Sequence, residues 1–583
     1  MTNTSYPPTV EAQGQGTFID GLTTINVTAT SSGGRAYGVI ANNQKGSGTV
    51  TPTTEVVLNQ VDITATGENG ASSYGIYGSN QADITVESGG TITAVGDNAT
   101  GLYLTSSEIT FGGDTTVTGD TTGIELLLGT MNLSENATVT TNTMSASTGD
   151  TNLSSNSSLS VTGIEGGHSY LGTVNAEDAE NANVSVGTGA FTIGSYTGDS
   201  KSVTFTDLAG NDGTTIQSLT GETTFIADQS SNDQYASALE AAQALGKAVT
   251  VEGETVDDSY DIVIEEGTLN DSLKGHRLGD QTIVVDSVTK NSFVDGFGSV
   301  SALSALQWRH EMNSLNKRMG ELRQSPAGIG TWARLYGSEM EYGAQSVTSK
   351  NTTLQVGTDV AVGNWKIGIA ANYTEGDSDY DNGEADTKNY GFAVYGSWLS
   401  ESGGYVDLIA KYSRLENDFL LSDHYGSYDN NALSFSAEFG HHFKFMDDRV
   451  FVEPQIGVAY GYVNSADFKT NDGIRIEQDS YESLIGRIGV RTGFTFPDNK
   501  GSIYARVSGV YDFKGELDSH FSMDGSASTN FSYEDLGGSW VEYGIGANFN
   551  WTDNTYTYID LERTSGGEVN ENYRWNIGLR HVF

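Results

Sequence analysis

The sequence has no cysteine, few prolines and few basic residues for its length. Its 583 residues include 73 glycines but only 6 prolines, and glycine shows no period of three, which excludes a collagen-like chain. Without cysteine the chain has no disulfide, thiolate nucleophile or cysteine-based zinc site. This absence would suit a chain that must stay extensible while it crosses a membrane, but it does not require one. No run of about 18 apolar residues occurs, so no transmembrane helix is expected, although barrel strands need only about 10 alternating residues.

Acidic residues dominate the first half of the chain. The formal net charge is −46, and the basic groups of residues 1–290 are only Arg35, Lys45, Lys201, Lys247, Lys274, Arg277 and Lys290. Because nucleic acids are held by Lys and Arg side chains on phosphates, we expect no nucleic-acid partner. The N-terminal residues lack the basic and apolar regions of a secretory signal, so we expect that a signal was removed or that the sequence was trimmed.

The first half also repeats a short motif. Three copies are Val27-Thr-Ala-Thr before Ala36-Tyr-Gly-Val, Ile63-Thr-Ala-Thr-Gly before Ser73-Tyr-Gly-Ile, and Ile92-Thr-Ala-Val-Gly before Ala99-Thr-Gly-Leu. A recurrence of roughly 20 to 40 residues, with β-branched segments between Gly, Asn and Asp turns, predicts a solenoid, best a right-handed parallel β-helix over residues 1–225. The alternative is a disordered Thr/Ser/Gly tract, which the regular spacing of β-branched residues disfavours.

Two segments with a different pattern follow the repeats. Residues 226–298 contain a short helical pattern from Tyr235 to Gly246 and several β-branched strands, which predicts a compact cap. Residues 299–324 carry leucines at helical spacing together with Arg309 and Lys317, so we expect a helix that is too charged for lipid. About 20 residues at 1.5 Å each would still cross the thickness of a bilayer.

Residues 325–583 read as an antiparallel barrel with about twelve amphipathic strands. Val356 and Val360 lie on one outward face, and Ile367 and Ile369 on the next, with polar residues or glycine between them. Tight turns alternate with acidic segments that we expect to be long loops, at residues 376–386, 417–431, 463–475 and 515–538. A soluble β-sandwich is the alternative, but its outer face would not carry aromatic bands.

The final strand has the same alternation. Its outward residues are Tyr573, Trp575, Ile577, Leu579, His581 and Phe583, and polar residues or glycine lie between them. We expect this strand to close the barrel by pairing with the strand near Thr331, so that no open edge remains in the membrane.

A helix that enters a twelve-stranded C-terminal barrel behind a β-helical rod closely resembles the classical (type Va) autotransporters, with a passenger like those of AIDA and pertactin. The resemblance covers essentially the whole chain. Glu311-Met-Asn-Ser-Leu-Asn-Lys-Arg is similar to the linker helix of the family, Thr331-Trp-Ala-Arg to its first strand, and Val452-Glu-Pro-Gln to a recurring strand. Gly578, Leu579, His581 and Phe583 resemble the aromatic-ended signal for barrel assembly, except that the family usually has an aromatic residue at the position of His581.

The resemblance implies a location and a set of partners. The barrel would lie in the Gram-negative outer membrane, in contact with its lipid, after delivery by periplasmic chaperones and insertion by the barrel-assembly machinery. The passenger would reach the cell surface and remain attached or be released. Residues 226–298 would be the autochaperone region.

Self-cleavage is the sharpest chemical hypothesis. Some relatives sever the linker helix inside the barrel when an asparagine amide attacks its own backbone carbonyl, and Asn313-Ser314 stands at that position. By alternation, three carboxylates point into the lumen to orient the amide: Asp407, Glu438 and Glu453. The cleaving relatives carry two consecutive asparagines, whereas Ser314 replaces the second here. A polar helix residue packed in a charged lumen is the reading we favour.

Enzymatic and metal-binding passengers find little support. Gly198-Asp-Ser200-Lys resembles the nucleophile motif of serine-protease passengers but lacks the following glycine, and residues 1–290 offer only His168 and His276 as bases. His441 and His442 are adjacent on a strand and point to opposite sides, and Gly112-Gly113-Asp114 is not a convincing calcium repeat. We therefore expect no cofactor and no metal.

The sequence as a whole predicts an all-β autotransporter that displays its acidic rod as an adhesin or interaction rod for an unknown host or cell-surface ligand. It is not expected to be an enzyme beyond the self-cleavage hypothesis. Two alternatives stay open, an autotransporter with an enzymatic passenger and a passive channel with an extracellular extension.

Overall fold

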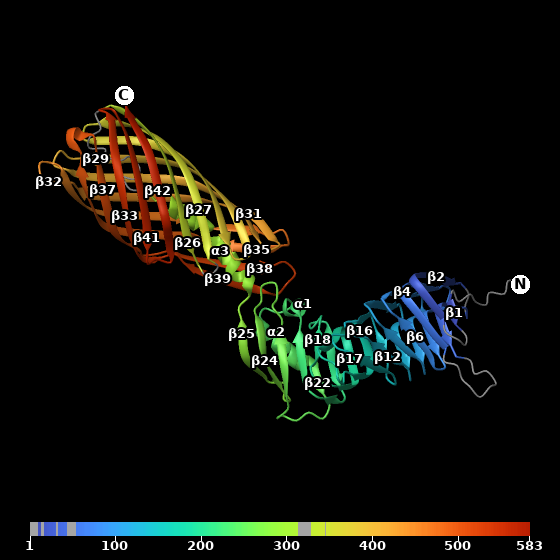
Figure 1. Ribbon diagram of the computed structural model, residues 1–583. Coiled ribbons are helices and arrows are strands. Elements are labelled where there is room, and N and C mark those ends of the chain that lie inside the picture. Colours follow the sequence, from blue (N-terminus) through green and yellow to red (C-terminus); the bar gives the residue numbers. More distant parts are fainter. Residues whose placement is uncertain (1–9, 13–16, 31–32, 44–53, 313–327, 344–345) are drawn as a thin grey trace. The chain divides into compact units, whose positions relative to one another are not determined.

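The computed structural model describes residues 10–12, 17–30, 33–43, 54–312, 328–343 and 346–583 (Figure 1). The chain divides into two compact units, one of residues 1–291 with 526–528 and one of residues 292–525 with 529–583. No helix in these described residues is long and apolar enough to span a membrane.

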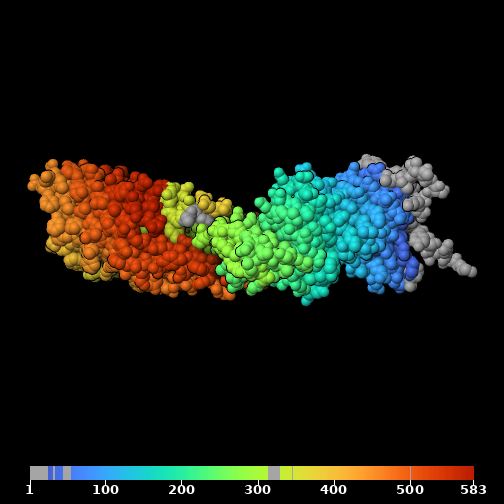
Figure 2. Space-filling model, turned by 90° about the horizontal axis from the view of Figure 1, so that it is seen from below, coloured from blue at the N-terminus to red at the C-terminus, as the bar shows by residue number. Residues whose placement is uncertain are grey.

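The first unit is a parallel β-solenoid. Its coils are built from β1 (Val10–Ala12), β2 (Thr17–Ala29), β3 (Arg35–Asn42), β4 (Thr54–Gly67), β5 (Ser72–Ser79), β6 (Ala82–Val86), β7 (Gly90–Val95), β8 (Asn98–Thr105), β9 (Glu108–Phe111), β10 (Thr115–Gly119), β11 (Thr122–Leu127), β12 (Thr130–Leu133), β13 (Thr138–Thr141), β14 (Met144–Ser145), β15 (Asp150–Leu153), β16 (Ser158–Asn175), β17 (Ala182–Thr197), β18 (Lys201–Phe205), β19 (Asn211–Ile216), β20 (Leu219–Thr220), β21 (Thr223–Ala227) and β22 (Val249–Val251). Successive coils appear as bands of colour from blue to green on the surface in Figure 2.

Three parallel ladders run along the solenoid, and each has its own outward chemistry. In the ladder of β6, β9, β12 and β15 the outward positions include Glu55, Asp83, Glu108 and Asp150, which we call the acidic face. In the ladder of β7, β10, β13 and β16 one outward column reads Thr91, Thr116, Thr140 and Ser160, which we call the hydroxyl face. The ladder of β3, β5, β8 and β11 carries Tyr37, Tyr74, Tyr77 and Tyr103, and we call it the tyrosine face.

The solenoid core lies between these ladders. Ile63, Ile92 and Val117 pair in register and are fully buried, as are Ile76 and Leu102 on the neighbouring ladder. Because each coil covers its apolar side chains only with the next coil, the core is continuous along the stack.

A cap closes the last coils. It contains α1 (Gln229–Asn232), α2 (Ala238–Ala248) and the antiparallel strands β23 (Ser259–Ile264), β24 (Ser272–Leu278) and β25 (Ile283–Thr289). Helix α2 begins after Ser237, whose hydroxyl accepts a hydrogen bond from the Glu240 N–H, as an N-cap residue does. The predicted cap extended to residue 298, whereas the structure starts the next helix, α3 (Ser292–His310), earlier than that.

The second unit is a closed antiparallel barrel. Its strands are β26 (Ile329–Tyr342), β27 (Val347–Val362), β28 (Trp365–Tyr380), β29 (Gly383–Leu399), β30 (Gly404–Leu421), β31 (His424–His441), β32 (Phe443–Phe445), β33 (Val450–Val463), β36 (Tyr481–Thr495), β37 (Gly501–Asp512), β40 (Gly538–Thr552), β41 (Thr555–Ser565) and β42 (Val569–Val582), with the 3-10 turn η2 (Pro497–Asn499) between β36 and β37. Strand β32 continues β31 beyond His442, so twelve strands complete the ring. The predicted closure is confirmed, because β42 pairs with β26 along its whole length.

Alternation sets the two surfaces of the barrel. Leu354, Val356, Ile367 and Ile369 are about half exposed, as the lipid-facing row requires, and the residues between them point inward. Inside the wall, aromatic rings lie on glycines, since an added Cβ at Gly440 would stand 2.3 Å from the ring of Tyr405.

The acidic segments are not the long loops that we expected. Residues 376–386 and 417–431 continue the strands β28 to β31 and leave only two-residue turns, while residues 463–475 and 515–538 contribute to a second sheet. That four-stranded antiparallel sheet consists of β34 (Ala466–Lys469), β35 (Ile474–Gln478), β38 (Glu516–Met523) and β39 (Thr529–Asp535). Outward carboxylates are tolerated on strands that extend beyond the apolar band, because water solvates them there.

Candidate functional site

The barrel lumen encloses α3, and polar side chains hold the helix in place. The Ser304 hydroxyl donates to Asn430 Oδ1 at 2.7 Å and accepts a hydrogen bond from Asn417 Nδ2 at 2.8 Å. Gln307 Nε2 donates to Asn417 Oδ1 at 2.8 Å. These three strand-to-helix bonds satisfy groups that burial would otherwise leave unpaired.

A single tryptophan fixes the depth of the helix. Trp308 donates from Nε1 to the Ser434 hydroxyl at 2.7 Å, and its ring lies on Gly461 of β33. A Cβ at Gly461 would stand 2.0 Å from the ring, so only glycine leaves the space that Trp308 occupies.

The small second sheet covers the start of α3. Gln478 Nε2 donates to the Ser301 carbonyl at 2.6 Å, and the Phe297 and Phe521 rings lie 5.6 Å apart. Near the other end of α3, Arg309 donates from Nη1 at 2.8 Å to the carbonyl of Leu536, which directly follows β39. The helix is therefore held by the barrel wall and by this sheet.

The end of the helix is also pinned. His310 has Ser338 Oγ 2.6 Å from Nδ1 and Thr353 Oγ1 2.9 Å from Nε2. Arg574 of β42 donates to the carbonyls of His310, at 3.0 Å, and Met312, at 3.2 Å. Helix ends leave carbonyls without partners, and this guanidinium supplies one.

Glu311 sits in a cluster of inward side chains immediately before the predicted cleavage position. Its carboxylate pairs with Lys411 and accepts hydrogen bonds from Asn372, Thr374 and Ser413, the last at 3.0 Å. Charged pairs of this kind are stable in a closed lumen only when further hydrogen bonds satisfy both ions.

The predicted catalytic carboxylates divide into two environments. Asp407 and Glu438 are register neighbours on β30 and β31, and both line a small luminal cavity with Glu311, Met312 and Arg487. Asp407 accepts a hydrogen bond from Ser397, and Glu438 accepts one from the Tyr405 hydroxyl at 2.7 Å.

Glu453 is also inward and buried, but it has other partners. Arg491 donates to it at 3.0 Å, His442 Nδ1 lies 2.8 Å from it, and Gln455 donates at 2.9 Å. Asn313 and Ser314 lie outside the described residues.

The other sequence candidates have structural surroundings of their own. His442 stacks on Phe451 and His441 packs against Phe443. In the described residues no group of three His, Cys, Asp or Glu side chains is arranged to hold a metal ion. Ser200 lies in a turn with φ +54°, and His168 has its ring on Tyr170 with Nε2 2.8 Å from Thr192 Oγ1.

The proposed assembly signal lies on the closing strand. Gly578 is covered by the Tyr558 ring, Leu579 and Phe583 face outward, and His581 Nδ1 lies 2.8 Å from the Thr555 hydroxyl. His581 also contacts the Phe583 ring, with centroids 4.6 Å apart.

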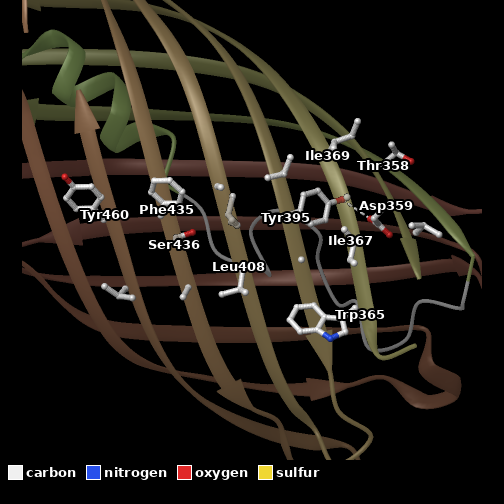
Figure 3. Close-up of a pocket in the computed structure, with 18 of the residues that line it drawn as sticks. Thr358, Asp359, Trp365, Ile367, Ile369, Tyr395, Leu408, Phe435, Ser436 and Tyr460 are labelled. Atoms are coloured by element: carbon white, nitrogen blue, oxygen red, sulfur yellow. Dashed lines mark hydrogen bonds between the residues drawn. The ribbon is translucent and has the colours of Figure 1, made fainter. Parts of the chain in front are cut away.

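Sequence reasoning missed the charged network at the barrel seam. Trp332 donates from Nε1 to the Tyr395 hydroxyl at 2.7 Å, and this hydroxyl donates to Asp359 at 2.9 Å. Asp359 also accepts a hydrogen bond from Arg580. Figure 3 shows the Tyr395 and Asp359 side chains of this network. In Figure 3 the Ile367 and Leu408 side chains belong to the apolar outer wall beside this network. The alternation of the two strands could have predicted that Asp359 and Arg580 point inward, because each lies between two outward residues in the sequence.

Comparison with known proteins places the second unit. The autotransporter β-domain profile matches residues 331–562. The serine protease EatA of Escherichia coli is 31% identical over 287 residues, which are 47% of this chain and 20% of that protein. The pertactin autotransporter of Bordetella parapertussis is 28% identical over 302 residues, which are 49% of this chain and 32% of that protein.

Solved structures of the same kind are also similar. The β-domain of the Bordetella autotransporter BrkA is 20% identical with a TM-score of 0.38, covering 44% of this chain and 100% of that one. The transport unit of AIDA-I from Escherichia coli is 14% identical with a TM-score of 0.39, covering 50% of this chain and 98% of that one.

The chain spans only about a fifth to a third of the length of these two curated relatives. The β-domain match covers most of a barrel that encloses a helix, and a parallel β-solenoid precedes it in the chain. Residues 331–562 are therefore an autotransporter β-domain, a barrel of the Gram-negative outer membrane.

Proposed function

We propose that the barrel supports export of its own solenoid, and that the displayed solenoid acts as an adhesin or interaction rod. The observation that carries the first part is α3, which threads the lumen and links the solenoid to the barrel strands. The three ladders support the second part, because each coil presents outward positions in the same three columns and so offers many contact points along the rod.

Display is tested by protease shaving of intact cells. We expect fragments of residues 1–225 in the shaved fraction and a protected barrel in the membrane. If residues 1–225 stay protected in intact cells and become accessible only after lysis, export of the rod is refuted.

Delivery is part of the same proposal. Periplasmic chaperones and the barrel-assembly machinery would carry and insert the barrel, reading Gly578, Leu579, His581 and Phe583. We expect the barrel of a His581→Phe variant to insert into the outer membrane faster than that of the parent chain. We expect the barrel of a Phe583→Ala variant to insert more slowly. If both variants insert at the same rate, these C-terminal residues are not the signal that the assembly machinery reads.

An enzymatic passenger is the rival proposal. Serine proteases are among the relatives that match, but those matches cover only about half of this chain at roughly 30% identity. Labelling of the displayed passenger by a serine-hydrolase probe would favour an enzyme over a rod.

Self-cleavage at Asn313-Ser314 is a second candidate. The observation that favours it is the placement of Asp407 and Glu438 around one cavity with Met312, the residue before Asn313. The amide Nδ2 of Asn313 would attack its own backbone carbonyl carbon, forming a cyclic imide and releasing the Ser314 amine. Mass spectrometry of outer membranes should then show two chains, and one chain after Asn313→Asp. A single full-length chain in both strains would leave α3 as a permanent tether.

A further inference from the structure

Four tyrosines gather on the tyrosine face of the solenoid. Tyr37 stacks on Tyr74 at 5.3 Å between ring centroids, and Tyr77 stacks on Tyr103 at 5.1 Å. Edge contacts of 5.3 to 5.7 Å join the two stacks into one group. We call this group the tyrosine cluster.

The backbone is shaped to present two tyrosines from one strand. In β5, Gly75 and Ile76 are both buried between Tyr74 and Tyr77, so both tyrosines face outward. Glycine is needed there, because an added Cβ at Gly75 would stand 2.6 Å from the carbonyl oxygen of Gly101. The same spacing brings Tyr103 beside Tyr77 on β8.

The coil fold does not itself require these aromatic rings. The next coil carries Thr122 and Glu125 in register with Thr100 and Tyr103, and the following coil carries Ser145. The apolar core beneath the cluster is complete, since Val39, Ile76 and Leu102 are fully buried. Tyrosine is therefore concentrated on three coils, whereas Thr122, Glu125 and Ser145 occupy the corresponding positions of the next two coils.

The cluster has the composition of a recognition surface. Tyrosine and arginine dominate binding hot spots, and serine, glycine and asparagine commonly surround tyrosine in binding loops. Arg35, one of the few basic residues in this half of the chain, donates from Nη1 to the Tyr37 hydroxyl at 3.1 Å. Tyr74, Tyr77 and Tyr103 are partly exposed, whereas Tyr37 is buried beside them.

The surrounding charges select the kind of partner. Glu55, Asp83 and Glu108 line up on the acidic face of the same coils, and the chain carries a net charge of −46. A polyanion would be repelled here, and a polycation would be drawn to the acidic face instead. A neutral sugar matches the cluster, because its C–H groups pack on aromatic rings while its hydroxyls exchange hydrogen bonds with phenol and guanidinium groups.

We infer that the tyrosine cluster and Arg35 form a binding site for a neutral oligosaccharide. This inference rests on the proposed function of the solenoid as an interaction rod. Three coils at about 4.8 Å per step span roughly 10 Å, which suits two or three sugar units.

The test uses the full chain displayed on cells. The probes are fluorescent dextran, mannan, galactomannan and chitin oligosaccharides, with heparin as a polyanion, chitosan as a polycation and fibronectin as a protein. The variant Tyr77→Ser with Tyr103→Ser places at these positions a residue type that the next coils carry. Tyr170→Ser is the matched control, because Tyr170 lies further along the same ladder and is exposed.

We expect the parent chain to bind at least one neutral glycan, the double variant to bind it at least about tenfold more weakly, and Tyr170→Ser to bind it unchanged. Equal resistance of all displayed solenoids to trypsin shows that the coils remain folded. An unchanged affinity of the double variant would overturn the site. Binding of heparin, chitosan or fibronectin but of no neutral glycan would overturn the ligand class while leaving the rod function in place, whereas binding to none of the probes would count against both.

Discussion

Arg580 and Asp359 are bonded to each other although their strands are not neighbours. The Arg580 guanidinium, on β42, reaches across Gly330 of β26 and donates two hydrogen bonds of 2.6 Å to the Asp359 carboxylate on β27. A Cβ at Gly330 would stand 2.0 Å from the guanidinium, so glycine is what opens this passage. The pair therefore fastens the closing strand to the second strand of the barrel.

Removing one partner of this pair should weaken the barrel. Arg580→Met leaves the Asp359 carboxylate buried without its cation, which costs about 3–5 kcal/mol. We expect the variant to lose its folded mobility on cold-sample gels at a lower temperature than the parent chain. Asp359→Leu in the same chain should restore part of the loss, because the carboxylate that lost its arginine is then removed as well.

Arg563→Met is the control for that series, since Arg563 is exposed on the neighbouring strand β41. If Arg580→Met and Arg563→Met unfold at the same temperature, the seam pair does not stabilise the closed barrel.

Gly461 should decide whether α3 seals the lumen. Gly461→Ala places a Cβ where the Trp308 ring now lies, so we expect the helix to shift and the conductance of the purified protein in planar bilayers to rise several-fold. Gly457→Ala on the same strand is the control, because its Cβ would meet only ordinary contacts at 3.5 Å or more. Deleting residues 299–324 should give the upper limit of conductance, and a deletion with unchanged conductance would show that the helix is not the plug.

Lys201 should make the stability of the solenoid depend on alkaline pH. Its ammonium group donates to three carbonyls, those of Gly198 at 2.6 Å, Thr220 at 2.9 Å and Glu222 at 3.2 Å, and burial lowers the pKa of Lys201 to about 8. Between pH 8 and the ordinary lysine pKa near 10.5, the unfolded chain holds more protons than the folded one. The free energy of unfolding therefore rises with pH in this window, by at most about 1.4 kcal/mol per unit, and Lys201 adds no pH dependence below it.

Urea unfolding followed by circular dichroism at pH 7, 8.5 and 9.5 measures this effect. Lys201→Met should be less stable than the parent chain at every pH, because three carbonyls lose their donor, and the gap should widen as pH rises. Lys247→Met removes an exposed lysine of α2 and should track the parent at all three values. A gap that stays constant would contradict the assigned role of burial.

Repulsion between carboxylates of the acidic face should lower the stability of the stacked coils. Asp83 is in register with Glu55 and Glu108, and burial, followed by the charges of Glu108 and Glu55, raises the pKa of Asp83. Asp83→Asn should raise the free energy of unfolding by about 0.2–1 kcal/mol, and 1 M salt should shrink that gain. Because its pKa is raised, Asp83 in the folded parent chain becomes protonated in mild acid and loses its negative charge. The stability gain from Asp83→Asn should therefore also be smaller in mild acid. A gain that is insensitive to both salt and pH would have a cause other than repulsion.

The barrel was the more predictable half of this chain. Lipid tolerates only apolar outward residues, so Val356, Ile367 and their neighbours reveal the strands by parity alone. Parity does not identify strands beyond the edge of the bilayer. Acidic segments such as residues 376–380 are equally compatible there with a strand and with a loop, because water solvates the side chains in both. The small second sheet forms from segments far apart in sequence, and local pattern carries no record of that pairing.

The luminal site was predictable only in part. Parity places Asp407 and Glu438 inward, but the partner of Glu311 is Lys411, and no local pattern connects two residues so far apart in the chain. The start of α3 at Ser292 was also missed, because Ser, Gly and Asp at its first turns are weak helix formers. His424 of β31 packs against Phe293 and Phe297 in these turns, and Phe521 of the second sheet packs against Phe297.

The three-ladder arrangement of the solenoid has an evolutionary consequence. From β6 to β14 each coil contributes one strand to each ladder, so recombination between two similar coils would insert a complete set of outward positions without disturbing the core. Gene segments of this kind can lengthen or shorten by whole coils, and each duplication of the β5 or β8 coil would add further tyrosines to the same column. The number of aromatic positions could then change in one genetic event while the fold stays the same.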